Sequence, residues 1–229
     1  MKPRVAVLTF PGSNDDGDAR LALEALGAEA VATWHADPEL PSDVTAVVLP
    51  GGFSYGDYLR CGAIARFSPA LGAVRHYAEE GGLVLGICNG FQILCEAGLL
   101  PGVLRPNRQL AFVCRDVRLR VESAATPFTS RCADGQELVI PVKHGEGSWY
   151  APPELVEELA ANGQLVLRYA EECNGSVAEV AGVTNAAGNV MGLMPHPEHA
   201  VDALLGSTDG ALILGSLVDA ARDRLSVAV

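Results

Sequence analysis

Short apolar runs alternate with helix-like segments through the first half of the chain. Runs with the length of buried strands stand at residues 5 to 10, 29 to 34, 46 to 49 and 83 to 87. Between them, apolar side chains recur at helical spacing up to about Leu26 and again from about Ala70 to Glu80. This order predicts an α/β fold, a mostly parallel sheet with helices on both faces and ligands at the carboxyl ends of its strands.

The second half of the chain has a different pattern. Residues 112 to 121 and 137 to 142 alternate apolar and polar side chains, which is typical of sheet that partly faces water and predicts an antiparallel extension. Further elements are expected as a helix at 153 to 162, strands at 165 to 169, 176 to 183 and 190 to 194, a hairpin turn at 185 to 189 and an amphipathic helix at 210 to 224. We expect a single domain spanning residues 1 to 229.

The composition narrows the function classes. The net charge of -12 repels phosphate backbones and anionic lipid surfaces, so we expect no nucleic-acid and no membrane partner. No apolar run approaches the ~20 residues that cross a bilayer, and the first run is too short for a signal peptide. The six cysteines form no C-x-x-C pair, which favours reduced thiols and no metal site. A cytoplasmic protein is expected.

The strand at residues 83 to 87 ends at a cysteine between two glycines, in the sequence Gly86-Ile87-Cys88-Asn89-Gly90. This spacing is that of the nucleophile elbow, in which a strained strand-to-helix turn presents a nucleophile. The N-terminus of the following helix aims unpaired N–H groups at the sulfur and favours its thiolate form. A buried cysteine at an ordinary tight turn fits these five residues equally well.

A second dense segment reads Pro195-His196-Pro197-Glu198. The two prolines favour an extended chain, which places His196 and Glu198 on one face roughly 6.5–7 Å apart. A carboxylate at that distance can orient the imidazole, so Cys88, His196 and Glu198 fit the roles of nucleophile, base and orienter. Taken alone, the segment is more often a proline-rich turn, but the elbow and this segment support each other.

Four other stretches have chemical interest. Pro50-Gly51-Gly52 follows a predicted strand, and its glycines let backbone N–H groups approach an oxyanion. The loop at residues 52 to 62 is either a binding loop or partner surface, or a surface loop whose aromatic side chains pack back on the body. We interpret residues 144 to 147, His-Gly-Glu-Gly, as a hairpin turn, and the aspartates at 15, 16 and 18 as solvated carboxylates at a helix start.

Five segments together resemble a known family. They are residues 10 to 14 (Phe-Pro-Gly-Ser-Asn), 51 to 61, 86 to 92, 144 to 147 and 194 to 198 (Met-Pro-His-Pro-Glu). The elbow with its Gln92, the glycines at 51 and 52, and the His-Pro-Glu triplet resemble the class I triad glutamine amidotransferases, which release ammonia from glutamine. The finer pattern resembles, nearly end to end, the glutaminase subunits of phosphoribosylformylglycinamidine synthase in purine biosynthesis.

The resemblance implies a flavodoxin-like glutamine amidotransferase type 1 domain and a thioester mechanism. In that mechanism Cys88 attacks the side-chain amide of L-glutamine, and His196, held by Glu198, gives a proton to the departing ammonia. Water then releases glutamate from the cysteinyl thioester.

The same resemblance implies roles for four residues around the nucleophile. The backbone N–H groups of Gly52 and Asn89 would form the oxyanion hole, and Gln92 and Gly145 would help to seat glutamine. No metal ligand is implied in this subunit.

The family also implies partners. Ammonia would pass to an ATP-dependent synthetase subunit that converts formylglycinamide ribonucleotide to formylglycinamidine ribonucleotide, often with a small third subunit in the complex. This chain has no G-x-x-x-x-G-K-[ST] loop, so ATP and Mg are expected to belong to the synthetase and no cofactor to this subunit. The loop at residues 53 to 60 is a candidate for part of the contact.

Three positions depart from the family's pattern. Asp15 stands where cysteine is frequent, His199 follows Glu198 where arginine is frequent, and Lys143 precedes His144 where a small residue is common. We expect neither Asp15 nor His199 to touch the proposed triad.

Two other functions are weighed against the glutaminase. Another cysteine hydrolase on a similar sheet, such as an intracellular peptidase-like protein, would share the elbow, but Gln92 and the paired His196 and Glu198 argue against it. A catalytically silent regulatory or binding module would keep the fold and release no ammonia from glutamine.

Overall fold

The computed structural model describes residues 2–227. Its main strands are β1 (Arg4–Thr9), β2 (Glu29–Trp34), β3 (Ala46–Leu49), β4 (Leu83–Ile87), β6 (Val113–Val121), β7 (Glu137–His144), β9 (Leu165–Tyr169), β10 (Val180–Thr184) and β11 (Val190–Leu193). Its α-helices are α1 (Asp16–Ala25), α2 (Pro69–Glu79), α3 (Asn89–Glu96), α4 (Pro153–Ala161) and α5 (Gly210–Val227). Two short strands, β5 (Val103–Arg105) and β8 (Ser148–Tyr150), pair with each other as a separate sheet.

The main strands form one sheet in the order β2-β1-β3-β4-β11-β10-β9-β6-β7. The first five of these run parallel to their neighbours, and the pairs from β11 to β7 are antiparallel. The predicted parallel sheet with an antiparallel extension is therefore confirmed. The strand β11 joins the two parts, with β4 on one side and β10 on the other.

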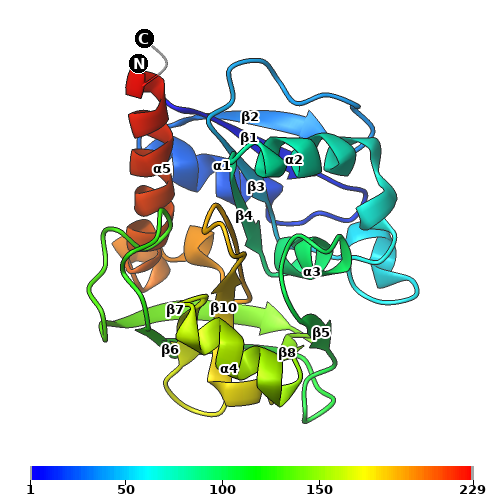
Figure 1. Cartoon of the computed structure of the whole chain (residues 1–229), viewed down its shortest axis with the longest axis vertical. Coiled ribbons are helices and arrows are strands. Elements are labelled where there is room, and N and C mark those ends of the chain that lie inside the picture. The colour runs from blue at the N-terminus through cyan, green and yellow to red at the C-terminus, as the bar shows by residue number, and fades with distance from the viewer. Residues whose placement is uncertain (1, 228–229) are drawn as a thin grey trace.

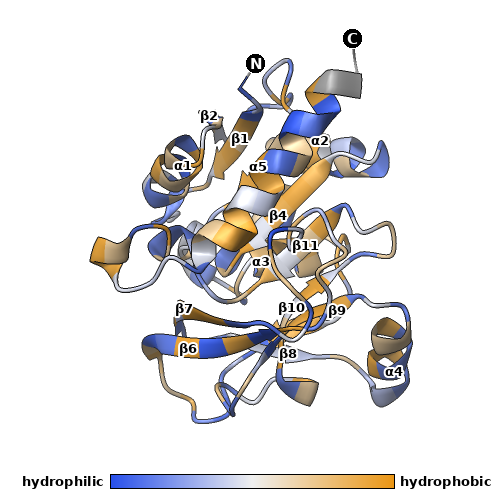
Figure 2. Ribbon diagram, turned by 90° about the vertical axis from the view of Figure 1, so that its left-hand side faces the viewer, coloured by the Kyte–Doolittle hydropathy of each residue, from blue (hydrophilic) through white to orange (hydrophobic). Residues whose placement is uncertain are grey.

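Helices cover both faces of the parallel part. Figure 1 shows α1 and α5 on one side of β1 to β4, and α2 and α3 on the other. The strands β3, β4, β10 and β11 are buried along their whole length, because helices or neighbouring chain cover both of their faces. Figure 2 shows β4, β10 and β11 as largely hydrophobic, whereas β6 alternates hydrophilic and hydrophobic positions as the sequence predicted.

The helix predicted at residues 210 to 224 is α5, which runs three residues further, to Val227. Of the positions predicted to face inward, Leu214, Leu217, Val218 and Ala221 are fully buried and Leu212 is partly buried against the core, which confirms the predicted apolar face. Within the described part of the chain, no helix has both the length and the apolar character needed to span a membrane.

One predicted strand is partly wrong, and two short strands were not predicted. The strand expected at residues 176 to 183 begins only at Val180, because the 3-10 helix η3 (Val177–Glu179) precedes it. Ala178 and Glu179 have φ of 52° and 56°, a left-handed conformation that a strand cannot contain. The strands β5 and β8 were missed, since three-residue strands carry too little periodicity to detect.

Candidate active site

Cys88 stands at the turn between β4 and α3, where the sequence places the elbow. Its φ of 50° and ψ of −102° lie outside the regions that a side chain adopts without strain. The backbone N–H of Cys88 donates to the carbonyl of Leu193 at the end of β11, 2.8 Å away. A strained, non-glycine residue anchored at a strand-to-helix turn is the geometry of a presented nucleophile.

The elbow depends on a close approach of backbones. A Cβ at Gly90, in the first turn of α3, would lie 2.0 Å from the carbonyl oxygen of Leu49 at the end of β3. Only a glycine therefore lets the helix start this close to the neighbouring strand, and this approach keeps Cys88 at the carboxyl edge of the sheet.

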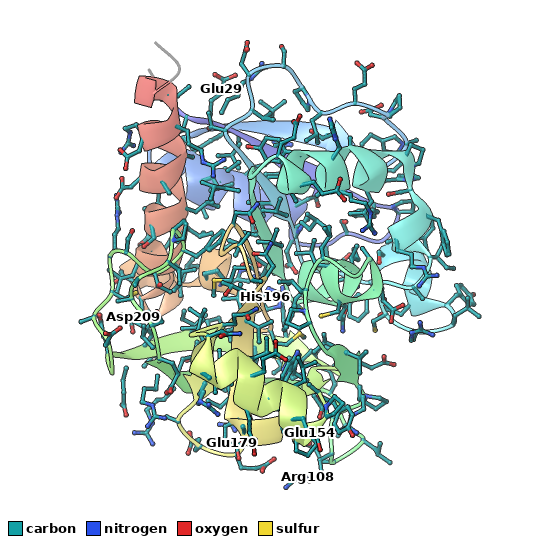
Figure 3. The ribbon with its side chains drawn as sticks, viewed as in Figure 1. Glu29, Arg108, Glu154, Glu179, His196 and Asp209 are labelled. Carbon is teal, nitrogen blue, oxygen red and sulfur yellow. The ribbon has the colours of Figure 1, made fainter. Side chains whose placement is uncertain are left out.

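His196 and Glu198 follow β11, the strand next to β4, so the sheet itself brings them to Cys88. The His196 Nδ1 lies 2.6 Å from Glu198 Oε1, and both side chains are buried. The segment is not extended as predicted, because Pro197 begins a 3-10 helix, η4 (Pro197–His199). The pairing is nevertheless made, through the turn rather than along one face of an extended chain. Figure 3 shows His196 at the centre of the molecule.

The electrostatics of His196 favour its protonated form. Burial alone would lower the pKa of His196, but the charges of Glu198 and Cys88 outweigh it and raise this pKa to about 10. The His196 Nε2 is buried and has no hydrogen-bond partner within the described residues. An imidazole held through Nδ1, with a partnerless Nε2 and with Cys88 lining the same cavity, can exchange a proton with a reacting molecule.

Cys88 lies between two small cavities. One cavity, of about 160 Å³, is lined by Gly52, Phe53, Asp57, Cys61, Cys88, Gln92, Phe112, Lys143, His144, Gly145 and Glu146. The other, of about 90 Å³, is lined by Asn14, Asp15, Gly52, Phe53, Cys88, Phe112, Lys143 and His196. The first therefore has the residues expected to seat a substrate, and the second has the proton carrier.

The structure places Gln92 and Gly145 in the wall of the larger cavity, as the resemblance implies. The Gln92 amide donates to the carbonyl of Glu146 at 2.7 Å and accepts from the Asn89 side chain at 2.9 Å. These bonds hold the segment after β7 against α3. Gln92 therefore shapes the cavity wall.

The segment His144-Gly145-Glu146-Gly147 is not the hairpin turn predicted from the sequence. It leads from β7 in the main sheet to β8 in the small sheet, and these two strands do not pair. His144 is buried, with its Nδ1 3.1 Å from Asn107 Oδ1. Burial and the charge of nearby His196 lower the pKa of His144 to about 4, so this imidazole is neutral near pH 7.

Gly52 and Asn89, to whose backbone N–H groups the resemblance assigns the oxyanion hole, both lie beside Cys88. Gly52, with a φ of 143°, lines both cavities beside Cys88, and its neighbours Gly51 and Phe53 make the hydrogen bonds to the first loop. Asn89 is the first residue of α3, whose leading N–H groups have no carbonyl partner within the helix. Both residues are therefore adjacent to Cys88, and their role as oxyanion donors stays a prediction.

The expectation that Asp15 and His199 stay away from the triad is wrong. Asp15 Oδ2 lies 3.7 Å from His196 Nδ1, and His199 Nε2 lies 3.7 Å from Glu198 Oε1. Asp15 is also buried, not a solvated carboxylate, with Lys143 Nζ 2.5 Å and His199 Nε2 3.2 Å from its Oδ1. The three residues that depart from the family's pattern thus form one cluster. The departure of all three from the family's pattern is a signal in the sequence, but it does not show that the three side chains meet.

Donor atoms of Asp15, His196, Glu198 and His199 lie within 4.8 Å of one another, a spacing that could hold a metal ion. The ammonium group of Lys143 already neutralises Asp15, and Glu198 is bonded to His196. The positive charge of Lys143 therefore occupies the position beside Asp15 at which a metal ion would bind.

Residues 2–209 match the family described as CobB/CobQ-like glutamine amidotransferase domain. The phosphoribosylformylglycinamidine synthase subunit PurQ of Rubrobacter xylanophilus is 57% identical over 219 residues, covering 96% of this chain and 99% of that protein. The subunit PurQ of Mycobacterium tuberculosis is 54% identical over 221 residues, covering 96% and 98%.

A solved structure, described as PurLQS from Thermotoga maritima, has a chain with the same fold. It superposes with a TM-score of 0.89 at 45% identity, covering 96% of this chain and 99% of that chain.

Proposed function

This chain belongs to the CobB/CobQ-like glutamine amidotransferase family, as a glutaminase component of phosphoribosylformylglycinamidine synthase, and we propose that Cys88, His196 and Glu198 carry out its chemistry. The observation that carries the proposal is the strained Cys88 beside the free Nε2 of a histidine that Glu198 holds through Nδ1. Nucleophile, proton carrier and orienter are then present together.

The reaction follows from these positions. The Cys88 thiolate attacks the side-chain carbonyl carbon of glutamine, and the His196 imidazolium gives its proton to the departing nitrogen, which leaves as ammonia. The resulting thioester is attacked by water, whose proton His196 accepts. The cysteine is released, and the net change is glutamine plus water to glutamate plus ammonia.

Charge develops on the carbonyl oxygen in both steps. We assign its stabilisation to the backbone N–H groups of Gly52 and Asn89, which stand beside Cys88. A preorganised donor of this kind typically contributes ~10²–10³ in rate. The larger cavity seats the substrate, with Gln92 and Gly145 in its wall, and its Asp57 and Glu146 carboxylates suit an α-ammonium group.

The ammonia serves a second protein. The relatives are named as synthase subunits, and the Thermotoga maritima structure is described as PurLQS, which supports a synthetase partner for this chain. In this proposal the synthetase uses ATP and Mg to activate formylglycinamide ribonucleotide, this subunit uses no cofactor, and a small third subunit completes the complex. A cytoplasmic location belongs to the same proposal and is supported by the six free cysteines.

The loop at residues 53 to 60 is the proposed contact with the synthetase. Phe53, Tyr58 and Leu59 expose much of their apolar side chains to solvent. Tyr55 alone turns inward, where its hydroxyl lies 2.7 Å from His35 Nδ1. Both hypotheses made from the sequence therefore apply to parts of the loop: one aromatic side chain packs on the body, and the others are exposed and available to a partner.

Reconstitution with the synthetase tests the proposal. We expect Cys88→Ala to abolish glutamine-dependent formation of formylglycinamidine ribonucleotide, while added ammonia still supports it at the wild-type rate. Loss of both activities would contradict this division of labour. Alkylation by a glutamine analogue at a residue other than Cys88 would contradict the assignment of the nucleophile.

A further inference from the structure

A second carboxylate lies beside the histidine of the site. Asp15, at the start of α1, is 3% exposed and directs Oδ2 towards His196 Nδ1 at 3.7 Å. Its other oxygen, Oδ1, accepts from Lys143 Nζ at 2.5 Å and pairs with His199 Nε2 at 3.2 Å. The first loop, the end of β7 and η4 therefore meet in one cluster at the proton carrier.

The backbone fixes this approach. A Cβ at Gly51 would lie 2.4 Å from Asp15 Oδ2 and 2.6 Å from His196 Cε1, so the carboxylate and the imidazole both pack against the bare backbone of this residue. The Gly51 carbonyl also accepts from the N–H groups of Asn14 and Asp15, at 3.2 and 3.3 Å. The backbone therefore brings Asp15 close to His196, and the contacts of its carboxylate with Lys143 and His199 complete the placement.

We propose that Asp15 is a positioning residue for His196, a second carboxylate that stabilises the imidazolium by charge while Lys143 and His199 hold it in place. At 3.7 Å it is too far for a hydrogen bond, so the Nδ1–H remains with Glu198. The inference rests on the proposed function only through the role of His196 as the proton carrier.

The protonation of Asp15 itself agrees with this role. Burial would raise the pKa of Asp15, but the hydrogen bonds from His199 and Lys143 and the charge of His196 hold it well below its ordinary value. The carboxylate is therefore charged throughout the working range of the enzyme. The groups that face His196 are Glu198, Asp15, His199, Cys88 and His144.

The ion pair with Lys143 offsets the cost of burying a second carboxylate in the site. Asp15 and Lys143 together add no net charge to the buried site; the lysine binds Oδ1, while Oδ2 of the same carboxylate lies 3.7 Å from the imidazole Nδ1. Loss of the aspartate alone would leave the lysine ammonium unpaired beside an imidazolium. Loss of both groups would remove a neutral pair and disturb His196 less.

Alkylation of Cys88 by iodoacetamide tests the inference, because the rate follows the thiolate–imidazolium pair and needs neither glutamine nor the synthetase. In the full chain, across acid to alkaline pH, we expect Asp15→Asn to slow alkylation several-fold at neutral pH. We also expect its alkaline inflection, where the imidazolium loses its proton, to move to lower pH by about 1–2 pH units.

The matched control is Asp18→Asn, the same change three residues later, at a half-exposed carboxylate whose Oδ2 lies 3.9 Å from His199 Nε2. Its profile should match the wild type. A profile of Asp15→Asn that coincides with that of Asp18→Asn would overturn the proposal.

The double variant Asp15→Asn with Lys143→Met separates charge from packing. We expect its inflection to lie closer to that of the wild type than that of Asp15→Asn does. An inflection of the double variant as low as that of Asp15→Asn, or lower, would overturn the proposal, since removal of the lysine charge would then fail to offset removal of the carboxylate charge. If the alkylation profiles of the wild type and the variants are as expected but the wild-type chain releases no ammonia from glutamine, the result counts against the proposed function and supports this inference.

Discussion

The Nδ1 of His196 and the Oε1 of Glu198 are 2.6 Å apart, in two side chains that expose 1% and 0% of their surface. A charge-assisted hydrogen bond of this length, shielded from water, holds the ring in one orientation and favours its protonated form. It leaves Nε2 without a partner, and in the proposed mechanism this is the atom that exchanges protons with the substrate. The role of Glu198 can therefore be measured through the behaviour of His196.

We expect Glu198→Gln to lower kcat for glutamine hydrolysis by about 10²–10⁴-fold. Burial lowers the pKa of His196, and Glu198 is the largest of the charges that raise it to about 10. Without that charge the imidazolium loses its proton at lower pH, so the alkaline limb of the pH–rate profile should shift to lower pH. Glu198→Asp, which keeps the charge, is expected to restore part of the limb. An unmoved limb in Glu198→Gln would show that Glu198 does not control His196.

The elbow glycine gives a prediction with an internal control. In Gly90→Ala the new Cβ meets the Leu49 carbonyl oxygen at 2.0 Å, so we expect a loss of about 1–3 kcal/mol in the free energy of unfolding and loss of glutaminase activity. Gly72→Ala adds the same atom to the exposed face of α2, where nothing lies within 4 Å. It should stabilise the protein by about 0.5–1 kcal/mol. Denaturant unfolding of both variants decides, and equal stabilities would refute the packing argument.

His144 predicts how stability depends on pH. Its pKa falls from 6.5 to about 4 on folding, so between these two pH values the unfolded chain binds a proton at His144 that the folded protein does not bind. The free energy of unfolding should therefore decrease as the pH falls from about 6.5 to about 4, by on the order of 3 kcal/mol, with no further loss from this group below. Urea unfolding at several pH values should give a flatter curve for His144→Gln. Parallel curves would mean that His144 does not contribute.

The proposed partner surface can be tested with two exposed leucines. Leu59 is 89% exposed with a φ of 72°, and aspartate tolerates this conformation better than leucine, so Leu59→Asp should not harm the fold. We expect it to weaken binding to the synthetase by at least about tenfold and to reduce glutamine-dependent synthesis. Leu204→Asp, at a residue 95% exposed elsewhere on the surface, is the control. Equal binding by both variants would place the contact elsewhere.

Most of the fold was predictable because its central strands are continuous apolar runs. The bounds of β2, β3, β4 and β9 agree with the sequence prediction residue by residue. The errors have physical causes. Left-handed residues before β10 interrupt an apparently continuous strand, and β5 and β8 are held by each other rather than by a pattern of their own.

The site was predictable where its chemistry is local in sequence. The elbow and the His196–Glu198 pair each occupy a few consecutive residues, and both were found. The cluster of Asp15 and Lys143 joins positions 128 residues apart, and no periodicity connects them. Only the fold, which brings the first loop to the end of β7, makes that pair visible.

The place of β11 in the sheet has a consequence for the stage of synthesis at which the chain can become active. This strand enters between β4 and β10 and is followed at once by His196, so the nucleophile has no base until more than a hundred residues after Cys88 have been synthesised. A nascent or truncated chain that stops before β11 leaves β4 with an open edge and its cysteine without a proton carrier. Incomplete chains should therefore not hydrolyse glutamine, because the proposed site is assembled only when β11 completes the sheet.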